Sequence, residues 1–370
     1  MIDTANVSEG PMLVKVHHTK AFQKVVEVTL NAPEALNAIN GAMVDLLLEK
    51  VPAWEADDDV IAIIMQGAGE KAFCAGGDIR ALYYEMAKGA QDVGEIFFNH
   101  EYEMDLMLHQ LKTPLIVWGS GYVIGGGMGL LQGAALRIGT HSSRLAMPEV
   151  TIGLFPDVGA SYFLRQVPDD LGLFLGLTGA MLNGVDAREL GLIDALVDDG
   201  DLSAVMSALL AMPKQSQAAT LNDLKSVMSQ LEVKAQAHSQ KSKLAPHKHD
   251  IVKALRQPSL DAIVASLVEL KGKDEWLDRA LSTMTHGSPT SLHLFYEAFS
   301  QNFKSVKEAL LHEYVVGVNA ARLGEFEEGV RALLIDKDKA PNWRYASVEA
   351  TPKAWIDQFF STKNVAKPHF

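Results

Sequence analysis

The feature that most constrains this chain is a run of six consecutive apolar residues, VIAIIM, at positions 60–65. A strand without a polar position has no face suited to water, so we expect it in a sheet that is covered on both sides. Residues 25–30 are a second strand candidate, rich in β-branched side chains, and residues 43–54 carry apolar residues at helical spacing. This alternation of strand, helix and strand predicts an α/β fold.

The alternation continues to about residue 210. Further strands are expected at 114–118, 136–140 and 145–150, with glycine-rich segments between them. Asp201 is expected to cap a helix that ends before Pro213. Together these patterns predict an α/β core over residues 1–213.

Beyond residue 213 the strand patterns stop. Segments 215–220 and 234–249 are polar and are interpreted as connectors. Ser259 is a candidate N-cap for a helix with a single apolar stripe, and residues 276–284 form a second stripe. Residues 214–370 are therefore predicted to be a helical C-terminal region that packs on the core or on a neighbouring subunit.

The charge balance excludes several classes of function. The formal net charge is −13, which disfavours non-specific binding to nucleic acid or to anionic membranes. No apolar run approaches the ~20 residues of a membrane-spanning helix. Cys74 is the single cysteine, so no intramolecular disulfide can form, and the first residues lack the pattern of a secretory signal. A cytoplasmic protein is expected.

No metal site is expected. His17 and His18, and the pair His247 and His249, lack accompanying cysteine or carboxylate ligands at metal-binding spacing. These histidines are interpreted as solvated. A serine-hydrolase elbow, G-x-S-x-G, is absent from the sequence.

The first segment that could contribute to a binding or catalytic site is FCAGGD at 73–78. Adjacent glycines between a strand and a helix let the backbone approach a ligand and turn an N–H outward. The alternative is a tight turn followed by a helix that Asp78 caps. Cys74 is interpreted as a small apolar lining residue and not as a nucleophile.

The second segment is GGGMGL at 125–130, between a strand and an apolar helix. Its amides would sit at the positive end of the helix dipole, where they suit an oxyanion. The alternative is close packing of this helix on the sheet. A dinucleotide-binding fingerprint does not fit, because no G-x-G-x-x-G occurs here.

The third segment contains two acids eight residues apart, Glu149 and Asp157, in a mostly apolar stretch. Apolar surroundings raise a carboxyl pKa, and neighbouring acids push their pKa values apart, which suits general acid–base chemistry. The alternative is one capping acid and one surface acid.

Together the three segments resemble the enoyl-CoA hydratase/isomerase, or crotonase, superfamily. The resemblance rests on KAFCAGGDIR (71–80), GGGMGL (125–130) and AMPEVTIGLFPDVGASYFL (146–164). Four further segments resemble the 3-hydroxyisobutyryl-CoA hydrolase branch, and they lie at 97–102, 177–179, 288–292 and 326–337. The resemblance implies a crotonase-like spiral of repeated ββα units with a helical C-terminal region.

The resemblance also implies roles for individual residues. Gly77 and Gly126 would supply the two N–H groups of an oxyanion hole for the thioester carbonyl. Glu149 and Asp157 would be the catalytic acids and contact the substrate, as would Gly126. Glu101 would line the acyl pocket and bind the substrate hydroxyl, although a His-Glu pair is also typical of an exposed helix surface.

Two positions depart from the family pattern. Hydratases of the superfamily carry a second glutamate where this chain has Gly129, which disfavours addition of water across a double bond. Many relatives have arginine where this chain has Ala32, so a basic contact to coenzyme A is either missing or supplied by Lys20, Lys71 or Lys337.

The resemblance therefore implies hydrolysis of 3-hydroxyisobutyryl-CoA to 3-hydroxyisobutyrate and coenzyme A, as in valine breakdown. Coenzyme A is part of the substrate, and no separate cofactor is expected. The sequence leaves open whether Glu149 is a nucleophile or a general base, which short 3-hydroxyacyl chain is preferred, and whether the chain is a homo-oligomer. The alternatives are an enoyl-CoA hydratase or isomerase of the same fold, and a non-catalytic acyl-CoA-binding protein.

Overall fold

The structure, a computed structural model, describes residues 7, 9–88, 92–235, 240–323 and 325–370. The chain forms two compact units. The first contains Met1–Gly77, Met107–Leu145 and Leu182–Ser242, and the second contains Asp78–Leu106, Ala146–Met181 and Lys243–Phe370. The division at residue 213 stays a prediction, since these units follow the contacts of the chain and not its linear order.

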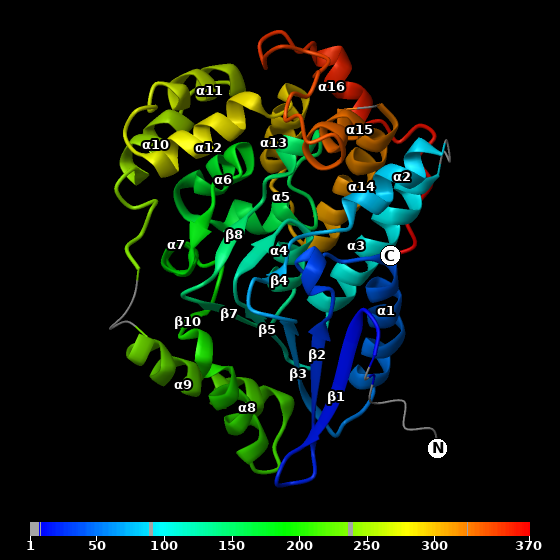
Figure 1. Cartoon of the computed structure of the whole chain (residues 1–370), viewed down its shortest axis with the longest axis vertical. Coiled ribbons are helices and arrows are strands. Elements are labelled where there is room, and N and C mark those ends of the chain that lie inside the picture. Colours follow the sequence, from blue (N-terminus) through cyan, green and yellow to red (C-terminus); the bar gives the residue numbers. More distant parts are fainter. Residues whose placement is uncertain (1–6, 8, 89–91, 236–239, 324) are drawn as a thin grey trace. The chain divides into compact units, whose positions relative to one another are not determined.

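The first unit is built on a six-stranded sheet with the order β1-β2-β3-β5-β7-β10. β1 and β2 pair antiparallel as a hairpin, and the other neighbours pair parallel. Figure 1 shows β1, β2 and β3 side by side. The strands are β1 (Met12–His18), β2 (Lys24–Leu30), β3 (Val60–Gly67), β5 (Leu115–Gly119), β7 (Leu136–Thr140) and β10 (Ala195–Val197). The first six residues of β3 are all buried, which confirms that both of its faces are covered.

A smaller sheet has the strand order β4-β6-β8-β9. Its strands are β4 (Ala72–Cys74), β6 (Tyr122–Ile124), β8 (Arg144–Ala146) and β9 (Leu182–Asn183). The predicted strand at 145–150 is wrong in its second half. β8 ends at Ala146, and Pro148, which has no N–H to donate to a sheet, adopts φ −94° and begins the 3₁₀ helix η2 (Glu149–Ile152).

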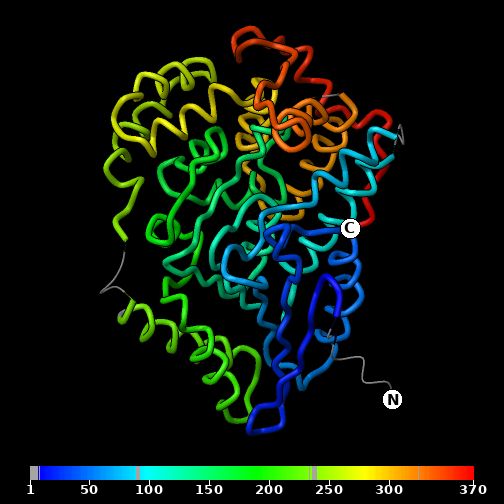
Figure 2. The backbone as a smooth tube through the Cα atoms, in the orientation of Figure 1, coloured from blue at the N-terminus to red at the C-terminus, as the bar shows by residue number. Residues whose placement is uncertain are grey.

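Two helices cover one face of the larger sheet. Leu209 of α8 (Leu202–Ala211) and Leu224 of α9 (Gln217–Ala235) belong to one apolar cluster with Ile61 and Trp118 of the sheet. Figure 2 shows both helices in green beside the strands. The connector predicted at 215–220 is therefore wrong, because α9 begins at Gln217 and turns its polar residues outward. Of the connector predicted at 234–249, residues 236–239 lie outside the described residues, and α10 begins within the rest, at Lys248.

The remaining helices of the first unit are short or lie at its edge. They are η1 (Pro33–Ala35), α1 (Gly41–Glu55), α4 (Gly126–Gln132), α7 (Gly184–Glu189) and the 3₁₀ helix η5 (Asp199–Asp201). Helix α1 begins where the Asn40 side chain accepts the N–H of Met43, and it covers the predicted segment 43–54.

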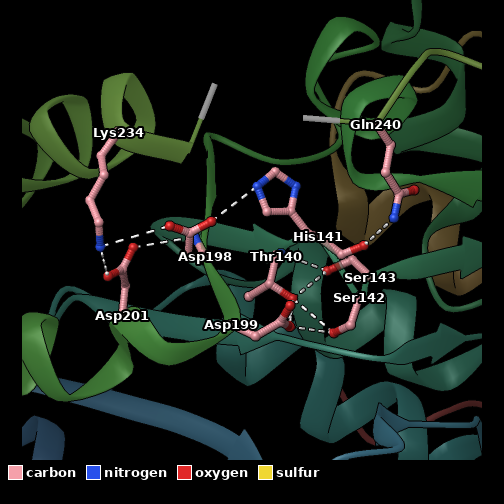
Figure 3. Close-up of polar contacts among 9 residues, drawn as sticks. All are labelled: Thr140, His141, Ser142, Ser143, Asp198, Asp199, Asp201, Lys234 and Gln240. Carbon is pink, nitrogen blue, oxygen red and sulfur yellow. Dashed lines mark hydrogen bonds and ion pairs between the residues drawn. The ribbon is translucent and has the colours of Figure 1, made fainter. Parts of the chain in front are cut away.

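A polar network holds the ends of β7, β10 and α9 together (Figure 3). Asp199 accepts the hydroxyls of Thr140, at 2.5 Å, and of Ser142. Lys234 Nζ lies 3.1 Å from Asp201 Oδ1 and 3.7 Å from Asp198 Oδ2. Asp201 is the N-cap residue of α8, as predicted, but its side chain makes no capping hydrogen bond to that helix. Its carboxylate instead accepts the N–H of Asp198 in a capping box that closes η5.

The second unit is helical apart from its connecting segments. The whole of α6 (Leu171–Thr178) is buried, and α10, α12 and α13 pack against it. Figure 2 shows α10, α11 and α12 lying together. The other helices are α2 (Ile79–Ala87), α3 (Val93–His109, to Leu106 in this unit), η2, α5 (Ala160–Phe163), η3 (Leu164–Gln166), η4 (Pro168–Asp170), α10 (Lys248–Leu255), α11 (Leu260–Val268), α12 (Glu275–His286), α13 (Pro289–Ser300), α14 (Val306–Leu323), α15 (Glu325–Val330), the π-helix η7 (Arg331–Ile335) and α16 (Lys353–Phe359).

Several local predictions for the second unit are confirmed. Asp78 caps α2 by accepting the N–H of Ala81, and Ser259 caps α11 by accepting the N–H of Ala262.

The prediction for His247 is wrong, because this residue was expected to be solvated and is buried. Its ring stacks on Trp276, and its Nε2 lies 2.5 Å from Asp274 Oδ2, so this histidine joins α10 to α12.

No helix of the described residues combines the length and the sustained apolar character that crossing a lipid bilayer would require.

Candidate active site

In the first unit the two glycine turns meet. Gly76 has φ +104°, and a Cβ built on it would lie 3.4 Å from the carbonyl oxygen of Ile124 and 3.7 Å from the nitrogen of Gly126. These are ordinary contact distances, so the two turns lie against each other, and it is the positive φ that favours glycine at position 76. The N–H of Ile39 donates to the Gly76 carbonyl in an isolated parallel bridge, which fixes the backbone just before Gly77.

The amide of Gly126 is at the start of α4. Gly125 precedes it with φ +53°, a conformation that favours glycine, and its carbonyl accepts the N–H of Met128. The first N–H groups of a helix have no intrahelical acceptor and lie at the positive end of its dipole. The structure thus brings the Gly77 and Gly126 segments together, while their role as an oxyanion hole stays a prediction.

Gly127 has the packing role that was the alternative for this segment. A Cβ on Gly127 would lie 2.4 Å from the carbonyl oxygen of Cys74, so only glycine lets α4 approach β4 this closely. Cys74 itself is buried. The segment 125–130 therefore combines close packing at Gly127 with a helix N-terminus at Gly126.

In the second unit Glu149 opens the 3₁₀ helix η2. Its side chain is only 7% exposed, and Oε2 has no hydrogen-bond partner among the described residues. Burial raises the pKa of Glu149 well above its ordinary range, and the charges of Asp157 and Glu101 raise it further. Burial with one unpaired oxygen makes the charged form of this carboxyl less favourable than in water, so Glu149 binds a proton more readily than an exposed glutamate does.

Asp157 is also buried, but it has a donor. The hydroxyl of Tyr102, on α3, donates to Asp157 Oδ2 at 2.6 Å. Burial raises the pKa of Asp157 to about 6, and the Tyr102 hydrogen bond acts in the opposite direction. Of the two acids, Asp157 is therefore the one that ionises more readily.

Glu101 is buried on α3, which corrects the alternative of an exposed helix surface; the neighbouring His100 is exposed. Burial raises the pKa of Glu101 to about 8, and the charge of Asp157 adds to this effect. Asp105, one helical turn further, is 1% exposed, and neither of its carboxyl oxygens has a hydrogen-bond partner within the described part of the chain.

Burial raises the pKa of Asp105 well above its ordinary range, and the charges of Glu101, Asp157 and Glu313 raise it further. These electrostatic interactions link five buried acids of one unit, which we call the acid cluster: Glu101, Asp105, Glu149, Asp157 and Glu313. The arrangement can hold and transfer protons at neutral pH.

The segment 326–337 supports η2 from outside. A Cβ on Gly329 of α15 would lie 2.3 Å from the backbone of Ile152, so α15 rests directly on the 3₁₀ helix that carries Glu149. The structural role of this segment is therefore to fix the backbone beside an acid of the cluster.

These features match a known family. The model of the enoyl-CoA hydratase/isomerase family covers residues 25–360 of the chain. The chain belongs to this family.

Curated relatives within the family are similar over most of their length. The "3-hydroxyisobutyryl-CoA hydrolase, mitochondrial" of Xenopus tropicalis is 34% identical over 337 residues, which cover 90% of this chain and 86% of the relative. The protein of the same name from Homo sapiens is 33% identical over 355 residues and covers 93% and 90%, respectively.

Solved structures of the family have the same fold. An enoyl-CoA hydratase from Rhodobacter sphaeroides 2.4.1 matches with a TM-score of 0.80 at 29% identity, covering 94% of this chain and 97% of that one. A carnitinyl-CoA dehydratase from Mycobacterium thermoresistibile matches with a TM-score of 0.80 at 28% identity, covering 96% and 99%. The crotonase-like fold with a helical C-terminal region is confirmed.

Within the family pattern, three acidic or phenolic residues escaped the sequence reasoning: Tyr102, Asp105 and Glu313. The signal for Tyr102 and Asp105 was present, because residues 98, 101, 102 and 105 follow the spacing of one buried helix face, of which only Glu101 was singled out. Glu313 has no local signal, since its partners Gly159 and Ser161 lie more than 150 positions away in the sequence.

The three lysines proposed to contact coenzyme A can be reached from solvent, and their role in binding stays a prediction. Lys20, Lys71 and Lys337 are all exposed. Among the residues that the structure describes, no group of three or more His, Cys, Asp or Glu side chains is arranged to hold a metal ion. His17 pairs instead with Glu27, at 2.6 Å.

Proposed function

We propose that this chain hydrolyses 3-hydroxyisobutyryl-CoA to 3-hydroxyisobutyrate and coenzyme A. The observation that carries the proposal is the acid cluster, in which Oε2 of Glu149 has no hydrogen-bond partner among the described residues and Asp157 accepts the hydroxyl of Tyr102. Curated relatives named 3-hydroxyisobutyryl-CoA hydrolase, at 33–34% identity, support the choice of substrate.

In the proposed mechanism the N–H groups of Gly77 and Gly126 donate to the thioester carbonyl oxygen. Donors aimed at developing negative charge lower the barrier to the tetrahedral intermediate by several kcal/mol. The amides at the start of α4 are suited to this role because they have no acceptor within their own helix.

Glu149 then acts in one of two ways. As a general base, its carboxylate takes a proton from water, whose oxygen bonds to the carbonyl carbon as the C–S bond breaks. As a nucleophile, the carboxylate forms a mixed anhydride and expels the thiolate, and water then cleaves the anhydride. A single turnover in ¹⁸O-labelled water distinguishes them, because only the anhydride route can leave the label in Glu149.

Asp157 orients the water or shuttles to the leaving thiolate the proton that the water gives up. Its hydrogen bond from Tyr102 supports this role, since it fixes the direction of the carboxylate. Glu101, buried beside Asp157, binds the hydroxyl of the acyl chain.

The test is release of free thiol from a panel of acyl-CoA esters. We expect turnover of 3-hydroxyisobutyryl-CoA, and at least ~10-fold lower kcat/KM for isobutyryl-CoA, because a missing hydroxyl leaves a buried carboxyl unpaired. The kcat/KM for 3-hydroxypropionyl-CoA, which lacks the methyl branch, measures how strongly the enzyme selects for that branch.

Two other results would reject the proposal. Hydration of crotonyl-CoA without thiol release would identify an enoyl-CoA hydratase, which Gly129 disfavours because it supplies no second carboxylate on α4. Tight binding of acyl-CoA without turnover would identify a binding protein.

The metabolic pathway and the cellular location of the reaction are also proposals, and fewer observations support them. A role in valine breakdown follows from the substrate. A cytoplasmic location is proposed from the sequence, although the vertebrate relatives are named mitochondrial. Fractionation of the source cells tests this location.

A further inference from the structure

Glu313 of α14 binds the turn that follows Asp157. Its side chain is 0% exposed. Oε2 accepts the N–H of Gly159 at 2.7 Å, and Oε1 accepts the N–H of Ser161 at 3.0 Å and the Ser161 hydroxyl at 2.5 Å. All three donors lie within four residues of Asp157, so one buried carboxylate holds the backbone on which that acid stands.

The turn needs such an external hold. Val158 has φ +52°, a left-handed conformation that a β-branched residue rarely adopts, and Gly159 follows with φ +87°. A strained residue of this kind costs on the order of 1–3 kcal/mol and persists only when its surroundings enforce it. The N–H of Ala160 returns to the carbonyl of Asp157 at 2.9 Å, which closes the turn directly behind the acid.

Asp157 is thereby fixed from two helices. Tyr102 of α3 holds the end of its side chain, and Glu313 of α14 holds the backbone of its turn. The two helices pack closely, since a Cβ on Gly317 of α14 would lie 3.2 Å from the ring of Phe98 of α3. The position of the Asp157 carboxylate therefore depends on α14 as well as on its own segment.

A purely structural role explains the choice of residue poorly. Burial raises the pKa of Glu313 to about 7, its three hydrogen bonds lower it, and the charge of Asp157 raises it again. A second acid beside Asp157 is costly where stability alone is at stake, because like charges in a buried site repel.

We propose that Glu313 is a positioning residue, which fixes the direction of the Asp157 carboxylate by binding the amides of Gly159 and Ser161. The inference rests on the proposed thioester hydrolysis, in which Asp157 orients the water or shuttles a proton. Glu313 itself touches neither substrate nor water in this mechanism.

The test is a double-mutant cycle of Glu313→Gln with Asp157→Asn. Glutamine keeps the shape but turns an NH₂ group toward one of the donors, so the turn relaxes. We expect kcat to fall ~10–100-fold with KM changed less than about threefold, because a misplaced catalytic group affects the chemical step. In the Asp157→Asn background the same change should lower kcat less than about twofold, since the two residues act as one unit.

Asp186→Asn is the matched control. Asp186 is 0% exposed, and it too accepts a serine hydroxyl, that of Ser242 at 2.6 Å, and a backbone N–H, that of Asn183 at 3.2 Å. Its substitution should lower the free energy of unfolding to a similar degree while kcat stays within about twofold of wild type. Ser161→Ala, which removes one bond of three, is a milder variant if Glu313→Gln does not fold.

Three results would overturn the inference. They are an equal loss of kcat in both backgrounds, a loss no larger than that of Asp186→Asn, or a crystal structure of the Glu313→Gln variant in which Val158 keeps its left-handed φ and Tyr102 stays bonded to Asp157. The crystal structure does not depend on activity. If wild-type protein releases no thiol, the proposed function fails, and the geometry of the variant still decides whether Glu313 positions Asp157.

Discussion

Two buried acids of nearly equal exposure, Asp201 at 6% and Glu149 at 7%, have opposite surroundings. Each oxygen of Asp201 faces a donor: Lys234 Nζ at 3.1 Å and the N–H of Asp198 at 3.2 Å (Figure 3). Glu149 has an oxygen with no partner among the described residues, and its neighbours are acids. Since buried polar groups are normally hydrogen-bonded, the paired carboxylate of Asp201 indicates a structural role, and the unpaired oxygen of Glu149 supports the chemical role proposed for it.

The largest expected difference between the two regions is in turnover. Glu149→Gln should lower kcat for thiol release by at least ~10³-fold, because it removes the base or nucleophile. Binding of the acyl-CoA ester, measured by calorimetry, should be nearly unchanged. Turnover within ~10-fold of wild type would place Glu149 with the structural acids and break the comparison.

The hydrogen bond from Tyr102 to Asp157 should affect the pH dependence of kcat/KM. Tyr102→Phe removes a donor to the charged carboxylate, so the pKa of Asp157, about 6 in the intact protein, should rise. If ionised Asp157 is required, the acidic limb of kcat/KM moves to higher pH. An unmoved limb, with the variant folded, would mean that Asp157 does not control it.

The acid cluster should also make stability depend on pH. Folding raises the pKa of Asp157 to about 6, of Glu313 to about 7 and of Glu101 to about 8, mainly through burial. Above pH ~4 the unfolded chain has released protons that the folded state still holds, so the free energy of unfolding falls as pH rises from 5 to 8. Each such proton contributes a slope of about 1.4 kcal/mol per pH unit.

Asp105→Asn sharpens this test. The raised pKa of Asp105 also predicts that the free energy of unfolding falls as pH rises, and the isosteric amide removes this titrating group. Urea unfolding between pH 5 and 8 should therefore show a shallower decline for the variant than for wild type. An equal slope would show that Asp105 ionises alike in the folded and unfolded states.

The smallest expected effect is that of the structural acid. Asp201→Asn weakens the contact with the exposed Lys234 amine and the capping box of η5, so the free energy of unfolding should fall by about 1 kcal/mol. Thiol release per folded molecule should stay within about twofold of wild type. A large loss of turnover without a loss of stability would assign this network a functional role.

The acids that sequence reasoning found stand beside residues with strong local preferences. Pro148 precedes Glu149, Pro156 precedes Asp157, and the glycine turns at 76 and 125 require positive φ. Local backbone chemistry of this kind can be recognised in a single sequence, and so can the apolar strand β3.

The features that sequence reasoning did not find depend on tertiary contacts. Glu101 was weighed both as an acyl-pocket residue and as a surface residue, because nothing in its local sequence shows that its side of α3 is buried. The first residues of α9 were taken for part of a connector because segment 215–220 is polar, while residues that pack this helix on the sheet, Leu224 and Met228, come later in it. Single-sequence patterns do not record which distant element covers a helix face.

The claim that unpartnered acids are kept for chemistry is tested most directly by the free energy of unfolding of Glu149→Gln, measured beside its turnover at pH 8. A buried carboxyl with an unpaired oxygen is replaced there by a neutral amide of the same shape, so the account predicts equal or greater stability together with the loss of thiol release. A variant that is less stable by several kcal/mol and loses turnover only in proportion to its unfolded fraction would contradict it.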